Sequence, residues 1–309
     1  MIDLIIKSYK PNLKPSSLKI YMTSLRKLND GNDIKNIDFL QDYDNIILKL
    51  SSKKNNTKKN YLNAIIITLK ALKGNEELVE KYELLRDKYQ KEYNDIMSAH
   101  SKTDTQEKNW ITWETYLSMI EKVYETVKSF EKNTEWTETQ LLQYQGYLLL
   151  NLYRVFPLRN DFHDMSVKTQ RQFNSLNKSG TKDNYIIVPA NGKYKFILND
   201  YKTSAKYKQQ ILEIKDIKLK KIIKLFLKHN TSGYFIVSPT NISKAIDTNN
   251  LTKVLIGLSV KYTGKRVGSS MLRHIYLTTH IGPQLKEQEE LAKIMGHSPE
   301  MQSGYVKQD

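Results

Sequence analysis

The spacing of the apolar residues constrains this chain most strongly, because it keeps a helical period over most of the length. Leu18, Tyr21, Leu25 and Leu28 recur at steps of three and four, which places them on one face of a helix. The same period predicts further helices around residues 46–50, 57–72, 78–96, 113–127, 141–153, 216–228 and 285–295. We therefore expect a mainly helical protein.

One short region departs from this period. Tyr185–Val188 and Lys195–Leu198 are short apolar runs on either side of Asn191-Gly192, and an Asn-Gly pair between such runs predicts a β-hairpin. Gln210–Ile214 is expected to be a third strand. The sequence thus predicts a mainly α fold with one small antiparallel β-sheet (α+β).

Capping residues indicate where several helices begin and end. The residues expected at helix N-termini are Ser16 or Ser17, Thr57 and Thr137, the last with Gln140 in a capping box. Gly296 is expected to close the helix of residues 285–295.

The length of 309 residues favours two domains. The stretch Ser98–Asn109 is polar and aperiodic, so we expect an exposed connector there. The expected domains are residues 1–100, a helical bundle, and residues 101–309, which carry the sheet.

Charge and cysteine content limit the classes of function. The chain has 49 Lys and Arg against 33 Asp and Glu, a formal net charge of +16, which suits a polyanionic partner such as nucleic acid. Codon bias in an AT-rich genome would also enrich Lys, Asn, Ile and Tyr, so both explanations stay open. The absence of cysteine excludes disulfides, thiolate nucleophiles and Cys-rich zinc modules.

Signals for membrane insertion or secretion are missing from the sequence. No apolar run approaches the roughly 20 residues of a membrane-spanning helix. Residues 1–10 lack the order of charged, apolar and small residues of a secretion signal. We expect an intracellular protein with no membrane partner.

Five separated segments carry residue types suited to chemistry on phosphate. They are Pro157–Asp161, Asp200–Ser204, Ser270–His274, Met295–Ser298 and Gly304-Tyr305. In this order they resemble the active-site signature of the tyrosine recombinases (phage-type integrases): a first arginine, a hairpin lysine, an H-x-x-R box, a G-H box and a terminal tyrosine. The resemblance covers most of the chain.

The resemblance implies a fold, a reaction and partners. Residues 1–100 would be a core-binding (SAM-like) DNA-binding domain and residues 101–309 a catalytic domain, which together clamp double-stranded DNA. A homotetramer would cleave and rejoin strands through a 3′-phosphotyrosine, without cofactor or metal. The setting expected from the AT-biased composition is a virus or mobile element, and the protein would act in the host cytoplasm or nucleus.

The resemblance also assigns roles to single residues. Arg159 and Arg273 would hold the nonbridging phosphate oxygens, because guanidinium forks stay charged and bind two oxygens at once. Tyr305 would be the nucleophile and Lys202, on a hairpin turn, the general acid. His297 would donate a hydrogen bond to the phosphate.

The sequence departs from the family pattern at three places. Ser270 stands where the H-x-x-R box has histidine, and a serine can donate to phosphate but is a poor base. Phe162 stands where the family has Glu, with Asp161 and Asp164 on either side. Only four residues follow Tyr305, where relatives continue into a segment that packs on a neighbouring protomer, so a truncated chain and a different protomer exchange both stay open.

Further lysines are candidates for contact with the DNA backbone. They are Lys53, Lys54, Lys58, Lys59 and Lys206. Two alternatives to a recombinase stay open: a type IB topoisomerase-like nicking-closing enzyme, and a catalytically inactive DNA-binding protein on the same scaffold, which Ser270 motivates.

Overall fold

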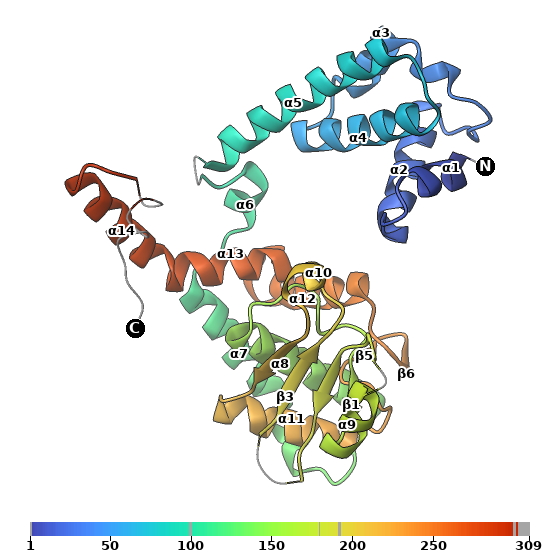
Figure 1. Ribbon diagram of the computed structural model, residues 1–309. Helices are drawn as coiled ribbons and strands as arrows, with labels where there is room; N and C mark the ends of the chain where they lie inside the picture. The colour runs from blue at the N-terminus through green and yellow to red at the C-terminus, as the bar shows by residue number, and fades with distance from the viewer. Residues whose placement is uncertain (1, 99–100, 179, 191–192, 299–300, 302–309) are drawn as a thin grey trace. The chain divides into compact units, whose positions relative to one another are not determined.

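The computed structural model describes residues 2–98, 101–178, 180–190, 193–298 and 301 (Figure 1). The chain divides into two compact units, Met1–Lys102 and Thr103–Asp309. The division falls inside the polar stretch Ser98–Asn109. No helix in the described part is long and apolar enough to cross a bilayer.

The first unit is a helical bundle. Its elements are α1 (Ile2–Tyr9), α2 (Pro15–Leu28), the 3₁₀ helix η1 (Asp38–Leu40), α3 (Tyr43–Leu50), α4 (Asn55–Ala71) and α5 (Glu76–Ser98). Helix α4 lies at the centre and packs against α1, α2 and α5, so Leu62, Ile65 and Leu69 are fully buried. The Tyr82 hydroxyl of α5 donates to the Leu40 carbonyl at 2.9 Å, which gives this buried phenol a partner.

Two of the expected N-caps in this unit are wrong. Helix α2 begins at Pro15 with Lys14 as its N-cap, so Ser16 and Ser17 lie inside the helix. Proline suits the first helical position because its fixed φ is helical and its missing N–H would have no helical acceptor there. Helix α4 likewise begins at Asn55, ahead of Thr57.

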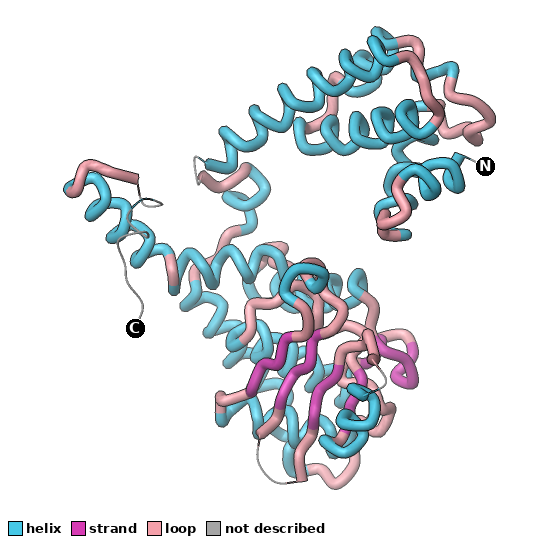
Figure 2. Tube along the Cα trace, viewed as in Figure 1, coloured by secondary structure: helices cyan, strands magenta, loops and turns pink. Residues whose placement is uncertain are grey.

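The second unit combines helices with two small sheets. Its helices are α6 (Asp104–Asn109), α7 (Trp113–Val127), η2 (Lys128–Lys132), α8 (Glu138–Val155), α9 (Gln170–Lys178), α10 (Ser204–Tyr207), α11 (Ile217–His229), α12 (Thr248–Thr263), α13 (Ser269–His280) and α14 (Gly282–Ile294). Its strands are β1 (Ser166–Lys168), β2 (Tyr185–Ile187), β3 (Lys195–Leu198), β4 (Gln210–Glu213), β5 (Val237–Ser238) and β6 (Asn241–Ala245). Figure 2 shows the strands as a small part of a mostly helical chain, which confirms the expected α+β fold class.

The larger sheet has the order β1-β2-β3-β4. Strands β2, β3 and β4 pair antiparallel, with Tyr185 of β2 opposite Ile197 of β3. The expected hairpin and third strand are therefore confirmed. Residues 191 and 192, the expected Asn-Gly turn, lie outside the described residues. Strand β1 adds to β2 in parallel, and β5 pairs with β6 in a separate sheet. The sequence pattern gave no sign of these three additional strands.

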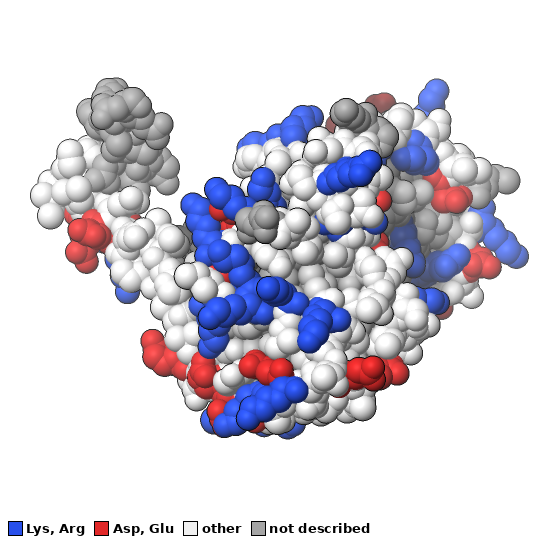
Figure 3. Space-filling model, turned by 90° about the horizontal axis from the view of Figure 1, so that it is seen from below, with Lys and Arg blue, Asp and Glu red and all other residues white. Residues whose placement is uncertain are grey.

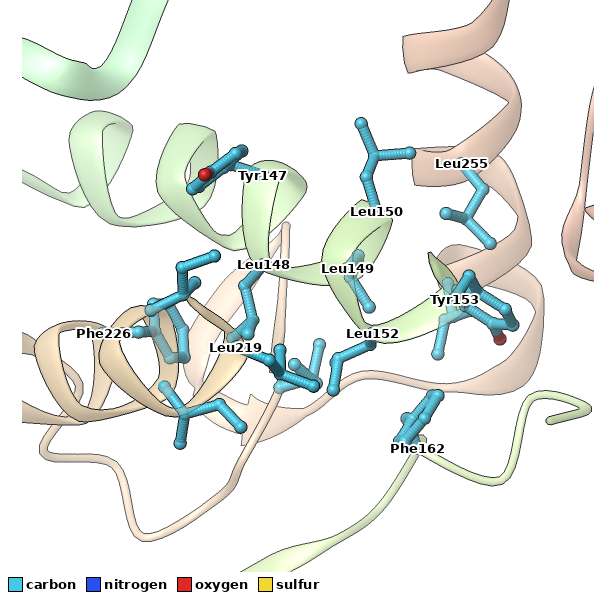
Figure 4. Close-up of a cluster of buried hydrophobic side chains, with 14 of the residues drawn as sticks. Tyr147, Leu148, Leu149, Leu150, Leu152, Tyr153, Phe162, Leu219, Phe226 and Leu255 are labelled. Atoms are coloured by element: carbon cyan, nitrogen blue, oxygen red, sulfur yellow. The ribbon is translucent and has the colours of Figure 1, made fainter. Parts of the chain in front are cut away.

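Helix α8 forms the core of the second unit. It packs against α7, α11, α12 and α13, and the side chains of Leu148, Leu149, Leu150 and Leu152 have no exposed surface. Figure 4 shows these side chains among Leu219 and Phe226 of α11 and Leu255 of α12. A helix that is apolar on nearly all sides is stable only when other elements surround it.

A single polar side chain of α8 links this core to β5. Gln145 is 1% exposed; its Oε1 accepts from the Val237 N–H at 2.7 Å and its Nε2 donates to the Val237 carbonyl at 2.9 Å. Buried backbone groups need such partners. Gln145 therefore fixes the position of a strand far away in the sequence.

The expectation of an irregular connector over Ser98–Asn109 is wrong in part. Asp104–Asn109 form helix α6, which begins with a capping box between Thr103 and Gln106. The helix is held from its C-terminal end, because the Lys265 ammonium donates to the Lys108 carbonyl and the Arg266 N–H donates to the Asn109 side chain. The two reciprocal cap bonds stabilise a helix that has no apolar period.

Replacing Gln145 by Leu should destabilise the second unit by about 2 to 4 kcal/mol, because two buried backbone groups of Val237 would lose their partners. All three tryptophans lie in this unit, so their fluorescence during urea unfolding reports on it alone. The exposed Gln143 of the same helix is the control, and Gln143→Leu should change the free energy of unfolding by less than about 0.5 kcal/mol. Equal effects of the two substitutions would contradict this role of Gln145.

Candidate active site

Arg159 follows the C-terminal end of α8. The helix stops at Val155 because the residue before a proline disfavours helical angles, and Pro157 follows. The buried Tyr153 then donates its hydroxyl hydrogen to the Arg159 carbonyl at 3.0 Å. The backbone of Arg159 is thus held by the helix that precedes it, while its side chain is exposed.

The next residue, Asn160, ties this turn to α12. Its Nδ2 donates to the Thr248 carbonyl at 3.0 Å and to the Thr252 hydroxyl at 2.9 Å. The turn that carries Arg159 is therefore fixed from two helices, α8 and α12.

Arg273 reaches the same turn from α13. Its Nε donates to the Pro157 carbonyl at 3.1 Å, and the side chain is half-buried. The pKa of Arg273 is lowered, first by burial and next by the positive charge of Arg159, while Asp161 opposes the shift. Arg273 therefore contacts the turn that carries Arg159, and an anion bound by both guanidinium groups would balance their like charges.

Asp161 is the acidic residue of this cluster. Burial raises the pKa of its carboxyl group, and the charges of Arg159, His163 and Arg273 act in the opposite direction. Phe162, at the position where the family has Glu, is fully buried and makes edge contacts with Tyr153 and Phe196. That position thus belongs to the hydrophobic core, and the neighbouring Asp161 is a carboxylate that raises the pKa of Arg273.

The start of α13 contributes two serines. Ser270 is exposed and lies one helical turn before Arg273, where its hydroxyl group is accessible. Ser269 is 8% exposed, and its hydrogen bond with Tyr153 partly offsets the rise that burial causes in the pKa of that phenol. Sequence reasoning missed Ser269, Tyr153 and Asn160, because nothing in their local pattern indicates that they hold the arginines in place.

Lys202 lies in the connection between the antiparallel strands β3 and β4, after the second strand of the expected hairpin. The side chain of the buried Asn184 accepts from the N–H groups of Asn199 and Asp200 and donates to the Asp200 carbonyl, all within 2.9 Å. Tyr201 is 9% exposed and donates to the Lys208 carbonyl at 2.7 Å. The backbone on both sides of Lys202 is therefore anchored, and its side chain is exposed.

His297 follows α14, which ends as the sequence predicts. Gly296 has φ 72°, and the His297 N–H donates to the Ala292 carbonyl at 3.0 Å, so the glycine closes the helix in a left-handed conformation. Figure 1 shows α14 continuing from α13 away from the sheet. Tyr305 lies outside the described residues.

The structure thus brings together part of the predicted site. In the described chain, the residues that bond to Arg273 or affect its pKa are Pro157, Tyr153, Arg159 and Asp161. Neither Lys202 nor His297 is among them. The described residues include no group of three or more His, Asp or Glu side chains arranged to hold a metal ion.

Four of the five lysines expected to contact DNA lie over tyrosine rings. In the first unit the ammonium groups of Lys53, Lys58 and Lys59 lie 5.5, 4.8 and 5.0 Å from the ring centroids of Tyr61, Tyr89 and Tyr93. Lys54 is exposed at the N-cap of α4. In the second unit Lys206 lies 5.1 Å from the centroid of Tyr207. These cation–π contacts orient the lysines without neutralising them.

Comparisons with known proteins yield one solved structure with a low similarity to this chain. No protein-family model matches it, and no curated protein matches it. Among solved structures it is similar to the crystal structure of XerA recombinase, with 13% sequence identity and a TM-score of 0.32 over 91% of this chain and 83% of that chain. A likeness at this level carries no argument for function.

The paired arginines should bind a small tetrahedral oxyanion. In isothermal titration of the full chain with tungstate at constant ionic strength, Arg273→Ala should weaken binding at least about tenfold, because charged hydrogen bonds are lost. Arg171 is exposed on α9, and Arg171→Ala is the control that should leave the affinity unchanged. Tungstate binding that is equally strong in the Arg273 variant would contradict an anion site at this pair.

Proposed function

We propose that this chain is a site-specific DNA recombinase or integrase that cleaves and rejoins DNA strands through a 3′-phosphotyrosine intermediate. The observation that carries the proposal is the hydrogen bond from the Arg273 Nε to the Pro157 carbonyl, which brings Arg273 to the turn that carries Arg159, although the two arginines are more than a hundred residues apart in the sequence. The resemblance to the tyrosine recombinases implies that these two arginines act on the same phosphate.

The arginine pair suits the charge of a phosphodiester under attack. The phosphate is already negative, and a fifth oxygen at phosphorus places more charge on the nonbridging oxygens. Two guanidinium groups can donate to those oxygens at any physiological pH. Ser270, exposed one turn before Arg273, would add a hydroxyl donor to the same oxygens. His297 would donate another hydrogen bond after α14 brings it to the phosphate.

In the proposed step the Tyr305 oxygen forms a bond to phosphorus as the bond from phosphorus to the 5′ oxygen breaks. The phenol loses its proton, which the positive field of the arginines favours, and Lys202 gives a proton to the departing 5′ oxygen. Attack by a 5′ hydroxyl group reverses the step. The phosphodiester energy is kept in the phosphotyrosine, so no cofactor is needed to reseal the strand.

The first unit would hold the duplex beside the catalytic unit. Its lysines Lys53, Lys54, Lys58 and Lys59 would contact phosphates of the backbone, as Lys206 would from the second unit. Protomers would bind inverted half-sites as a homotetramer and exchange strands in pairs. The intracellular DNA of a host that carries a virus or mobile element is the proposed setting.

One alternative function has an observation in its favour. Ser270 removes the histidine that helps to activate the tyrosine in the resembled family, and a protein that binds DNA without cleaving it would tolerate this change. Relaxation of supercoils without joining of two sites would instead indicate a topoisomerase-like enzyme. The presence or absence of a covalent adduct separates the enzyme from the binding protein.

A nicked duplex that traps the intermediate should form a covalent adduct with the full chain, visible on a denaturing gel. Duplexes that tile the DNA flanking the gene would supply the target. Tyr305→Phe should abolish the adduct while DNA binding is retained, because only the attacking oxygen is removed. The matched control is Tyr276→Phe, which removes the hydroxyl group of another tyrosine in the second unit. An adduct with the Tyr305→Phe variant, or none with the unmodified chain, would overturn the proposal.

A further inference from the structure

Helix α11 has one apolar face and one lysine face. Leu219, Ile222, Ile223 and Phe226 are buried against α8. The opposite face carries exposed lysines at steps of three and four residues, which we call the α11 lysine row: Lys218, Lys221, Lys224 and Lys228. The helix has no acidic residue.

The positive charge of this row is largely uncompensated. Lys218 lies 3.1 Å from a carboxylate oxygen of Glu121 on α7. In the part of the chain that the structure describes, Lys221, Lys224 and Lys228 make no ion pair. Figure 3 shows one face of the molecule on which Lys and Arg side chains gather, with some Asp and Glu side chains beside them.

The row lies on the face of α11 opposite the face that packs on α8. At one end of α11, Arg154 of α8 forms an ion pair of 2.9 Å with Asp216; at the other end, His229 stacks on Trp136 with ring centroids 4.1 Å apart. Helix α11 therefore runs antiparallel to α8, and its lysines point away from it. Figure 1 shows α8 between α11 and α13, which carries Arg273.

The size and composition of the row fit a nucleic-acid backbone. From Lys218 to Lys228 the helix rises about 15 Å, and duplex DNA carries about one charge per 1.7 Å of its axis, so several phosphates lie within this length. The row has no aromatic side chain, whereas protein interfaces are anchored by buried aromatic residues and arginine. Flexible, strongly hydrated ammonium groups favour phosphate contacts without base specificity.

We propose that the α11 lysine row binds the phosphate backbone of a second segment of duplex DNA, distinct from the segment held at Arg159 and Arg273. The protein would then contact two duplex segments on opposite sides of α8. This surface goes beyond the proposed cleavage activity and does not depend on Tyr305. A role of this kind would hold two distant DNA segments together while one of them is cut.

The test measures capture of a second duplex by the full chain. The chain is loaded to saturation on an immobilised duplex of mixed sequence, washed, and offered a fluorescent duplex of different sequence over a range of salt concentrations. The variant K221Q/K224Q/K228Q should load normally and capture the second duplex at least about tenfold less well near 0.1 M salt. Its salt slope should be smaller by about 2.7, the value for three phosphate contacts.

The control carries the same loss of charge elsewhere in the second unit. Lys122, Lys244 and Lys261 are exposed on α7, β6 and α12, and their triple change to Gln should leave second-duplex capture near the level of the unmodified chain. Circular dichroism reports whether each variant folds. If the triple variant does not fold, the single variants Lys221→Gln and Lys224→Gln replace it.

Three results would overturn the proposal. Equal capture of the second duplex by the α11 variant and the unmodified chain would show that the row does not bind that duplex. A loss of first-duplex loading as large as the loss of second-duplex capture would place the row in the first binding site. Binding of polyglutamate, lost in the α11 variant, without capture of a second duplex would assign the surface to an acidic protein. Failure of Tyr305 to form an adduct would leave this test unaffected, so the two proposals can fail separately.

Discussion

The burial of α8 is the interaction on which the second unit depends. Four leucines of this helix lie in the middle of the core, so α7, α11, α12 and α13 are all placed by contact with one element. The helix ends at Val155, before Pro157, and the turn that follows is bonded to Tyr153 inside the same helix. The backbone of this turn is therefore held by a residue of the core.

This arrangement explains why Arg273 lies against the turn that carries Arg159. Arg159 lies on the turn, and Arg273 comes from a helix that packs on α8 and bonds the Pro157 carbonyl. The positive charge of Arg159 lowers the pKa of Arg273, and the negative charge of the half-buried Asp161 raises it. Both arginines in turn lower the pKa of Asp161, which burial raises. Folding thus maintains a local excess of positive charge, which a bound phosphate would balance. The exposed lysines of α11 form a second positive surface, on the face of that helix opposite α8.

Much of the fold was predictable from the sequence because it is encoded by local pattern. Helix α7 has the predicted bounds, the capping box of Thr137 and Gln140 begins α8, and Gly296 closes α14. Strand β1 was not predictable, since three residues that pair in parallel with β2 leave no alternating pattern. Helix α6 was missed because cap bonds and contacts from Lys265 and Arg266 stabilise it in place of an apolar face.

The candidate site was predictable only where motifs mark it. The order of motifs led to Arg159 and Arg273, but Tyr153, Asn160 and Ser269 become important through packing between α8, α12 and α13, which no local pattern encodes. The expected assembly of Lys202, His297 and Tyr305 around one phosphate is a prediction about the complex with DNA. In the described chain Arg273 bonds to the turn that carries Arg159.

The central claim is that this arginine pair neutralises the charge of one phosphate during attack. Its most direct test replaces a charged nonbridging oxygen by a methyl group at the linkage where the covalent adduct forms. Arg273→Ala should slow cleavage of the ordinary phosphodiester by about two to three orders of magnitude. On the neutral methylphosphonate the same substitution should cost much less, because there is less charge to stabilise. An equal loss on both substrates, or adduct formation that is independent of Arg273, would contradict the account.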